Sequence, residues 1–304
     1  MIFKMNRLFN AAILLLLIQS LTLQAEEKSA IVIIAHGSRS QAWNESVLAL
    51  EKTISDRMAA TNSVKITRVA FMEMAQPTIA DVFGDLEKEG VTQVFAVPLF
   101  INPSGHSMFD VPGILGLYFD KELTEALAEE GIEIVDTDIK ITLGPSLQYG
   151  DLVEPILLER VKEMSEKPET EGIVLLAHGS PEFEPFWHKA CQKAGAYLCA
   201  KTGITKFDYA FIEVGQSFKT EGLPRILEMA GKCERVIVPG LYLGLAPLRI
   251  ANRYLKQEML DADWFGKQNV YFSDKGLLPD ERLTGWIIDR IQEWIESTER
   301  TESK

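Results

Sequence analysis

Four histidines occur in the chain, and two of them stand at the same place in two copies of one motif. In each copy an apolar run ends at a histidine that is followed by Gly-Ser, at His36 in the first copy and at His178 in the second. A neutral imidazole accepts a proton near pH 7 and binds transition-metal ions. The repeated motif therefore indicates histidine chemistry, either proton transfer or metal binding.

Two further polar side chains are expected close to His36. Glu73 ends the second apolar run of strand character, and His106 lies in the loop after the third. The carboxyl ends of parallel strands form the edge of a sheet at which ligands bind. Two imidazoles and a carboxylate suit a borderline divalent ion such as Fe, Co, Ni or Zn. We therefore predict His36, His106 and Glu73 as catalytic residues, with the two histidines as metal ligands.

The second half of the chain carries only part of this set. His178 has Glu213 as its counterpart of Glu73, but alignment of the two halves places Leu248 where the first half has His106. The complete site is therefore expected in the first half alone. His178 and Glu213 are expected to contact substrate, and the alternative for His178 is a remnant of the duplication.

Residues beside the histidines are candidates for substrate binding, namely Ser38, Arg39, Asn102 and Gly105. Ser38 and Arg39 either cap the following helix or, for Arg39, bind a ligand carboxylate through a forked pair. Asn102 and Gly105 belong to a loop at 102–112 that is rich in Gly and Pro, and long loops of this kind often bind ligands.

The pattern of apolar residues predicts strands that alternate with helices. In the first half, strands are expected at 31–35, 64–72, 93–100 and 132–135, and helices at 43–58, 78–89, 114–130 and 151–165. In the second half, strands are expected at 173–177, 206–213, 235–243 and 269–273, and helices at 184–201, 221–231, 246–260 and 280–297. Strands joined by helices of this length pair in parallel, and helices cover the sheet. The predicted fold class is therefore α/β.

An internal duplication organises the chain. Matching segments lie about 140 residues apart: His36 and His178, Glu73 and Glu213, and Val97-Pro98 and Val238-Pro239. Two repeats are too few for a solenoid. We predict two similar parallel-sheet α/β lobes with a cleft between them, one at 30–165 and one at 172–298, joined by a charged linker at 166–172. Because one chain supplies both lobes, a monomer is expected.

The first 25 residues have the order of a secretory signal peptide. Lys4 and Arg7 are basic, an apolar stretch of about 13 residues begins at Ala11, and Ala25 is a small residue before the expected cleavage site. A membrane span needs about 20 apolar residues. We therefore expect an exported, periplasmic or extracytoplasmic protein that has no stable membrane insertion after cleavage of residues 1–25. An uncleaved anchor is the alternative.

Composition excludes several other functions. A formal net charge of −13 does not suit nucleic-acid binding, which needs clustered Lys and Arg. The three cysteines, Cys191, Cys199 and Cys233, leave at least one thiol free or in an intermolecular bond, and none forms a Cys-x-x-Cys pair for zinc. Neither Ser38 nor Ser180 stands in the Gly-x-Ser-x-Gly elbow of a serine hydrolase.

Several segments in one order carry a family resemblance: His36-Gly-Ser-Arg39, Ala70–Pro77, Val97–Phe100 with Gly105-His106, and Asp110-Val-Pro112. They resemble the CbiX-type sirohydrochlorin chelatases. These are class II chelatases, lyases that insert a divalent metal into a tetrapyrrole without ATP. The similarity covers about residues 30–165 strongly and 172–256 more weakly.

The resemblance implies a bilobal chelatase fold with a tetrapyrrole in the cleft. His36 and His106 would handle the metal ion and accept the pyrrole protons, and Glu73 would assist. The expected substrates are Co²⁺ or Fe²⁺, with Ni²⁺ as a further candidate, and sirohydrochlorin or a related ring from cobalamin or sirohaem biosynthesis. No organic cofactor is expected. The alternative is an exported protein that binds metal or tetrapyrrole without catalysis.

Overall fold

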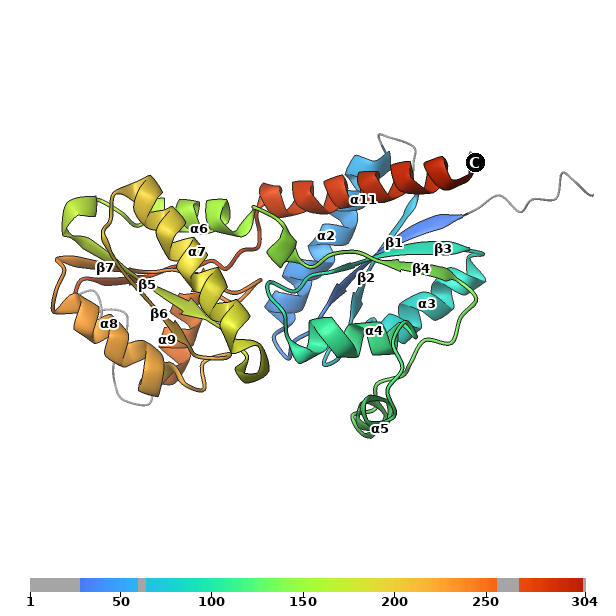
Figure 1. The fold of residues 1–304 in the computed structure, drawn as a ribbon, viewed down its shortest axis with the longest axis horizontal. Coiled ribbons are helices and arrows are strands. Elements are labelled where there is room, and N and C mark those ends of the chain that lie inside the picture. The colour runs from blue at the N-terminus through green and yellow to red at the C-terminus, as the bar shows by residue number, and fades with distance from the viewer. Residues whose placement is uncertain (1–27, 60–63, 256–267, 303–304) are drawn as a thin grey trace, which may run out of the picture.

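The computed structural model describes residues 28–59, 64–255 and 268–302. Two parallel sheets lie side by side, and helices cover both (Figure 1). The first sheet has the strand order β2-β1-β3-β4, and the second has the order β6-β5-β7-β9 with the short β8 beside β5. Central strands of such sheets are buried on both faces, which explains why every residue from Ala30 to Ala35 is apolar and fully buried. The predicted α/β class with two similar parallel-sheet lobes is confirmed.

The strands and helices of the first lobe position the histidines. Its strands are β1 (Ser29–Ala35), β2 (Ile66–Phe71), β3 (Gln93–Pro98) and β4 (Lys140–Leu143). Its helical segments are α2 (Gln41–Ala59), α3 (Ile79–Lys88), the π-helical turn η1 (His106–Asp110), α4 (Val111–Ile114), α5 (Lys121–Glu129) and the 3₁₀ turn η2 (Leu147–Tyr149). The helix α3 begins with a reciprocal capping box between Thr78 and Asp81.

The second lobe repeats this order. Its strands are β5 (Glu171–Ala177), β6 (Lys206–Phe211), β7 (Arg235–Val238), β8 (Gly240–Leu241) and β9 (Val270–Phe272). Its helical segments are η3 (Pro168–Thr170), η4 (Pro181–Phe183), α7 (Glu184–Thr202), η5 (Phe218–Gly222), α8 (Leu223–Ala230) and α9 (Pro247–Leu255).

The last helix of each half packs on the other half. Helix α6 (Val153–Lys162) follows the first sheet in sequence but lies against α7, whereas α11 (Glu281–Glu302) runs along the first lobe beside α2 (Figure 1). Trp294 of α11 stacks on Phe95 of β3 with ring centroids 5.4 Å apart. One hydrophobic core therefore contains residues of both halves. The lobe boundaries at 30–165 and 172–298 stay predictions about the sequence repeats. They do not describe the packing of α6 and α11, because each of these helices packs on the other half.

Two predicted elements of the first half are wrong. Residues 132–135 form no strand, and β4 pairs with β3 in their place. The helix expected at 114–130 is interrupted, because Gly116 adopts a φ of +69° and a new helix begins only after the N-cap Asp120. An apolar alternation shows which side chains are buried, but it does not show whether a neighbouring strand is available for pairing.

Most of the remaining elements agree with the prediction to within a few residues at their ends. The strand expected at 235–243 is divided into β7 and β8, the helix expected at 280–297 continues to Glu302, and the loop expected at 102–112 contains η1 and the start of α4. Within the linker expected at 166–172, Glu171 and Gly172 already belong to β5. The buried Glu171 carboxylate accepts hydrogen bonds from the Ser165 hydroxyl and from the backbone N–H groups of Glu166 and Lys167. The expected signal peptide at 1–25, and the end of the helix expected at 246–260, lie outside the described residues.

Two negative findings hold for the described part of the chain. No helix in residues 28–59, 64–255 and 268–302 is both long enough and apolar enough to span a membrane. The three cysteines are free thiols, and burial raises the pKa of the Cys191 thiol to about 12.

Candidate functional site

His36 follows β1 at the carboxyl edge of the first sheet, and the loop after β2 is tied to it. The backbone N–H of Glu73 donates to the carbonyl of His36 over 2.9 Å. This close approach depends on Gly37, which has a φ of +93° and on which a Cβ atom would overlap the carbonyl oxygen of Glu73. The glycine of the motif therefore allows Glu73 to reach the histidine.

The imidazole of His36 and the carboxylate of Glu73 face each other. His36 Nε2 lies 3.2 Å from Glu73 Oε1. The other ring nitrogen, Nδ1, lies 3.0 Å from the carbonyl oxygen of Gly37, and this contact assigns the ring hydrogen to Nδ1 as donor. In the neutral ring, the lone pair of Nε2 then points at a carboxylate oxygen. The contact is favourable only when a cation, either a proton or a metal ion, lies between the two atoms.

His106 joins this pair from the turn η1. Its ring centroid lies 4.6 Å from that of His36, with the planes at 79°. Its Nδ1 donates to Asp110 Oδ2 over 2.6 Å, because a helical turn brings residues four apart onto one face. Asp110 is not among the site residues predicted from the sequence, since residues 102–112 were expected to form a loop. The His-x-x-x-Asp spacing is the signal that points to it.

The two imidazoles differ in basicity. Burial lowers the pKa of His36, the hydrogen bond to Gly37 opposes that effect, and the neighbouring charge of His106 lowers it further. The hydrogen bond to Asp110 raises the pKa of His106 above its ordinary value, against the effect of burial. Environments that move two neighbouring pKa values apart assign different roles to the two groups. Of the two imidazoles, His106 is therefore the stronger base and His36 the weaker one.

The second lobe repeats the backbone of this site without its side-chain pair. His178 Nδ1 donates to the carbonyl of Gly179 over 2.7 Å, and the backbone N–H of Glu213 donates to the carbonyl of His178 over 2.9 Å. Although both side chains are among the described residues, no ion pair joins His178 to Glu213. The hydroxyl of Tyr242 donates to the backbone carbonyl of Glu213 over 2.8 Å. Leu248 lies in α9, at the position that corresponds to His106.

The other predicted contacts surround the first-lobe site in different ways. The Ser38 hydroxyl accepts a hydrogen bond from Ser40 N over 3.1 Å, while Arg39 is exposed. Asn102 is only 5% exposed, and its side-chain Nδ2 has no hydrogen-bond partner among the described residues. Gly105 precedes η1, where a Cβ atom would lie 3.9 Å from a carboxylate oxygen of Glu182 in the other lobe. Substrate contacts by Ser38, Arg39, Asn102, Gly105, His178 and Glu213 stay predictions.

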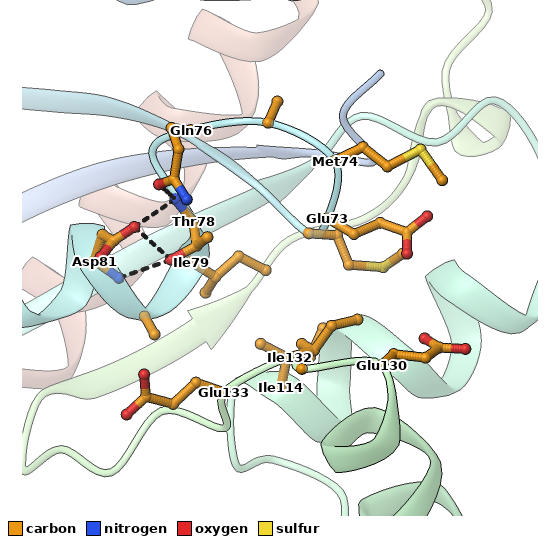
Figure 2. A pocket seen from close by; sticks show the side chains of 14 residues that line it. Glu73, Met74, Gln76, Thr78, Ile79, Asp81, Ile114, Glu130, Ile132 and Glu133 are labelled. Carbon is orange, nitrogen blue, oxygen red and sulfur yellow. Dashed lines mark hydrogen bonds between the residues drawn. The ribbon is translucent and has the colours of Figure 1, made fainter. Parts of the chain in front are cut away.

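Glu73 also lines a pocket of about 490 Å³. The loop after β2 forms one wall, and the segment after α5 forms the other (Figure 2). Carboxylates of Glu73, Glu130 and Glu133 belong to its lining, together with the apolar Ile114 and Ile132. Glu73 therefore borders both this pocket and the imidazole of His36.

The residue types at this rim, rather than their arrangement in the described residues, suit a divalent ion as substrate. Two imidazoles and a carboxylate gather at one rim, which is the ligand chemistry of borderline metals. Within the described residues, no group of three or more His, Cys, Asp or Glu side chains is placed to hold a metal ion together. Metal binding by His36 and His106 stays a prediction.

Comparison with known proteins places the chain in a family. The CbiX family model matches residues 30–164. The sirohydrochlorin cobaltochelatase of Methanococcoides burtonii is 32% identical over 142 residues, which are 45% of this chain and 98% of that protein. The sirohydrochlorin ferrochelatase of Priestia megaterium is 23% identical over 260 residues, which are 85% of this chain and 90% of that protein.

A solved structure shows the same fold. The sirohydrochlorin chelatase SirB from Bacillus subtilis subspecies spizizenii, in complex with cobalt, superposes with a TM-score of 0.57 at 20% identity and covers 90% of this chain and 97% of SirB. The matched family model, the related sequences and the shared fold agree with one another. The chain therefore belongs to the CbiX family of sirohydrochlorin chelatases, as an enzyme that joins two similar halves in one polypeptide.

Proposed function

We propose that this protein inserts Co²⁺ or Fe²⁺ into sirohydrochlorin or a related tetrapyrrole without ATP. Its relatives are named sirohydrochlorin cobaltochelatase and ferrochelatase, which supports this reaction and these two metals. The observation that carries the proposal is the contact between His36 Nε2 and Glu73 Oε1, which needs a cation, with the imidazole of His106 beside it.

The chemistry of insertion matches the proposed roles. A divalent ion enters the ring, four metal–nitrogen bonds form, and two pyrrole nitrogens each release a proton. His36 and His106 hold the incoming ion with help from Glu73, and His106, as the stronger base, accepts one proton at Nε2 once the ion has left for the ring. Asp110 then stabilises the imidazolium that results. When the ion leaves for the ring, the second proton takes its place between His36 and Glu73, so that the contact again has its cation.

The second lobe supplies the opposite wall of the cleft in this proposal. The neighbouring charge of His178 lowers the pKa of His36, which supports a position for the second lobe beside the first-lobe site. The exposed Arg39 next to His36 suits a carboxylate at the edge of the macrocycle. The half-buried Leu245 and Leu248 of the second lobe offer an apolar surface for a flat ring.

Metal insertion is measured directly by absorbance. The purified protein is mixed anaerobically with sirohydrochlorin and Co²⁺ or Fe²⁺, and the spectral change of the ring is compared with the spontaneous reaction. We expect a rate that is proportional to protein concentration and independent of ATP. Stoichiometric binding of metal or ring without turnover would contradict the proposal and would support a binding protein instead.

We also propose that the protein works outside the cytoplasm as a monomer after removal of residues 1–25. The order of basic, apolar and small residues supports export. The test is the intact mass of the chain recovered from the periplasmic fraction of expressing cells. A mature chain that begins near Glu26 is expected, and a full-length chain confined to the cytoplasm would contradict export.

A further inference from the structure

A chain of aromatic rings crosses from one lobe to the other beside His106. The ring of Phe109 in η1 lies 6.4 Å from that of Phe183 in η4 of the second lobe, centroid to centroid. Phe109 is also 6.0 Å from Tyr118, and Phe183 is 6.3 Å from Phe186. We call Tyr118, Phe109, Phe183 and Phe186 the aromatic bridge.

Three of the four rings of the aromatic bridge are open to solvent, and Phe183 is half-buried. Phe109 and Tyr118 are each 44% exposed, and Phe186 is 53% exposed. Exposed apolar side chains that cluster on a protein surface mark a site of interaction with an apolar partner. The bridge therefore has the character of a surface that an apolar partner covers.

The position of the bridge links it to the candidate site. Phe109 belongs to the same helical turn as His106, and Phe183 ends the turn that follows His178-Gly-Ser. The same two turns also approach each other at Gly105, where a Cβ atom would lie 3.9 Å from a carboxylate oxygen of Glu182. The bridge is thus formed where the histidine-bearing loops of the two lobes meet.

The lobes themselves are held together behind the bridge. The buried Trp187 donates from Nε1 to the carbonyl of Pro103 in the other lobe over 3.2 Å. The corresponding contact in the other direction brings Gly244 of the second lobe close to α2 of the first lobe. A Cβ atom on Gly244 would lie 3.0 Å from the Trp43 ring of α2. The shared core and the exchanged helices add to these contacts. The lobes are therefore held together by contacts other than the aromatic bridge.

We propose that Phe109 and Phe183 are the residues that grip the face of the tetrapyrrole and position it over His36 and His106. This inference rests on the proposed function. A flat conjugated ring packs on aromatic side chains in offset or edge contacts, while the carboxylates at its periphery remain in water. Because one phenylalanine comes from each lobe, the pair contacts the ring from both lobes.

The test separates ring binding from chemistry. Phe109→Ala and Phe183→Ala remove solvent-exposed or half-buried rings, so the fold is expected to persist. We expect each to raise the KM for sirohydrochlorin about three- to tenfold, the scale of one lost aromatic contact, with kcat and the KM for Co²⁺ within about twofold of wild type. Phe109→Tyr should restore the wild-type KM, since the ring is kept.

Phe119→Ala is the matched control, because Phe119 is 83% exposed and lies outside the aromatic bridge. It should leave the KM for sirohydrochlorin unchanged. If the wild-type protein catalyses insertion and the KM for sirohydrochlorin is unchanged in both Phe109→Ala and Phe183→Ala, the inference is overturned. The proposed function then remains intact. An equal rise in Phe119→Ala would also overturn it.

Binding of metal-free sirohydrochlorin, followed by its fluorescence, tests the bridge even if the wild-type protein shows no insertion. In that case the proposed function fails, but weaker binding of sirohydrochlorin by Phe109→Ala still supports contact between Phe109 and the ring. Two other occupants are distinguished by sedimentation. A wild-type dimer that Phe109→Ala dissociates, or binding to phosphatidylglycerol vesicles that Phe109→Ala abolishes, would overturn the assignment to the tetrapyrrole.

Discussion

Nε2 of His36 lies 3.2 Å from Oε1 of Glu73, although the other nitrogen of the same ring already donates its hydrogen to the carbonyl of Gly37. When the ring is neutral and the carboxylate is ionised, two electron-rich atoms face each other with neither a proton nor a metal ion between them. Burial, which lowers the pKa of His36, favours the neutral ring. The pair is therefore prepared to exchange a proton for a metal ion.

Removal of either partner of this pair is expected to stop metal insertion. His36→Ala and Glu73→Gln should each lower kcat by about 10²-fold or more, the range for a positioned acid–base group. His178→Ala and Glu213→Gln are the matched substitutions in the second lobe and should reduce the rate only a few-fold. His188→Ala controls for loss of a histidine, because His188 is bonded to Tyr209 and Glu184 in the second lobe, away from the His36–Glu73 pair. Equal losses in both lobes would show that the two halves share the catalytic work.

Asp110→Asn is expected to move the acid limb of the pH profile. His106 must be unprotonated to accept a proton or bind a metal, so the insertion rate falls as the pH drops through the pKa of His106. The hydrogen bond to Asp110 raises that pKa, and the asparagine removes the charge that favours the imidazolium. The acid limb should therefore shift to lower pH, with a lower maximal rate. Titration of the His106 ring by NMR in the metal-free protein measures the same shift, and an unchanged midpoint in both measurements would be inconsistent with it.

Gly37→Ala is expected to damage both stability and activity. The substitution places a Cβ atom on the carbonyl oxygen of Glu73 at a φ of +93°. Gly90→Ala is a matched control, since Gly90 has a φ of +75° with open space around it. Denaturant unfolding should show a loss of about 1 kcal/mol for Gly90→Ala from backbone strain alone, and a larger loss for Gly37→Ala. A similar free energy of unfolding for the two variants would mean that the loop of Glu73 moves aside freely.

Trp294→Ala is expected to destabilise the lobe that lies far from it in sequence. Trp294 is 8% exposed and stacks on Phe95 of β3. Loss of a buried tryptophan typically costs about 3–5 kcal/mol. Because the two halves share one core, unfolding should remain a single transition at lower denaturant concentration. Two separate transitions, or an unchanged midpoint, would show that α11 is not required by the first lobe.

The positions of His36 and Glu73 follow from local sequence patterns. An unbroken apolar run such as Ile31–Ala35 is typical of a strand buried on both faces, and the polar residue that ends it must lie at the sheet edge. The duplication strengthens this interpretation, since the same polar residues end the corresponding strands twice. The pair at the centre of the site is therefore predictable from the amino-acid sequence alone.

The role of Asp110 and the ends of several elements depend on contacts that no local pattern contains. Residues 102–112 carry Pro and Gly and predict a loop, yet part of this segment winds into a turn that aligns His106 with Asp110. The false strand at 132–135 has a strand-like pattern, but the edge of the sheet is occupied by β4. Whether a segment pairs as a strand depends on whether the fold of the whole chain brings it to the edge of the sheet.

By itself, the sequence determined the parallel α/β lobes, their duplication and the histidine and glutamate at the edge of the first sheet, because apolar periodicity and strand ends are local properties. Only the tertiary structure decided that α6 and α11 are exchanged between the halves, that His106 has Asp110 as its partner, and that Phe109 meets Phe183 across the lobes. The helix exchange and the Phe109–Phe183 contact join segments that are distant in the chain. The His106–Asp110 contact depends on a helical turn that its tertiary neighbours stabilise.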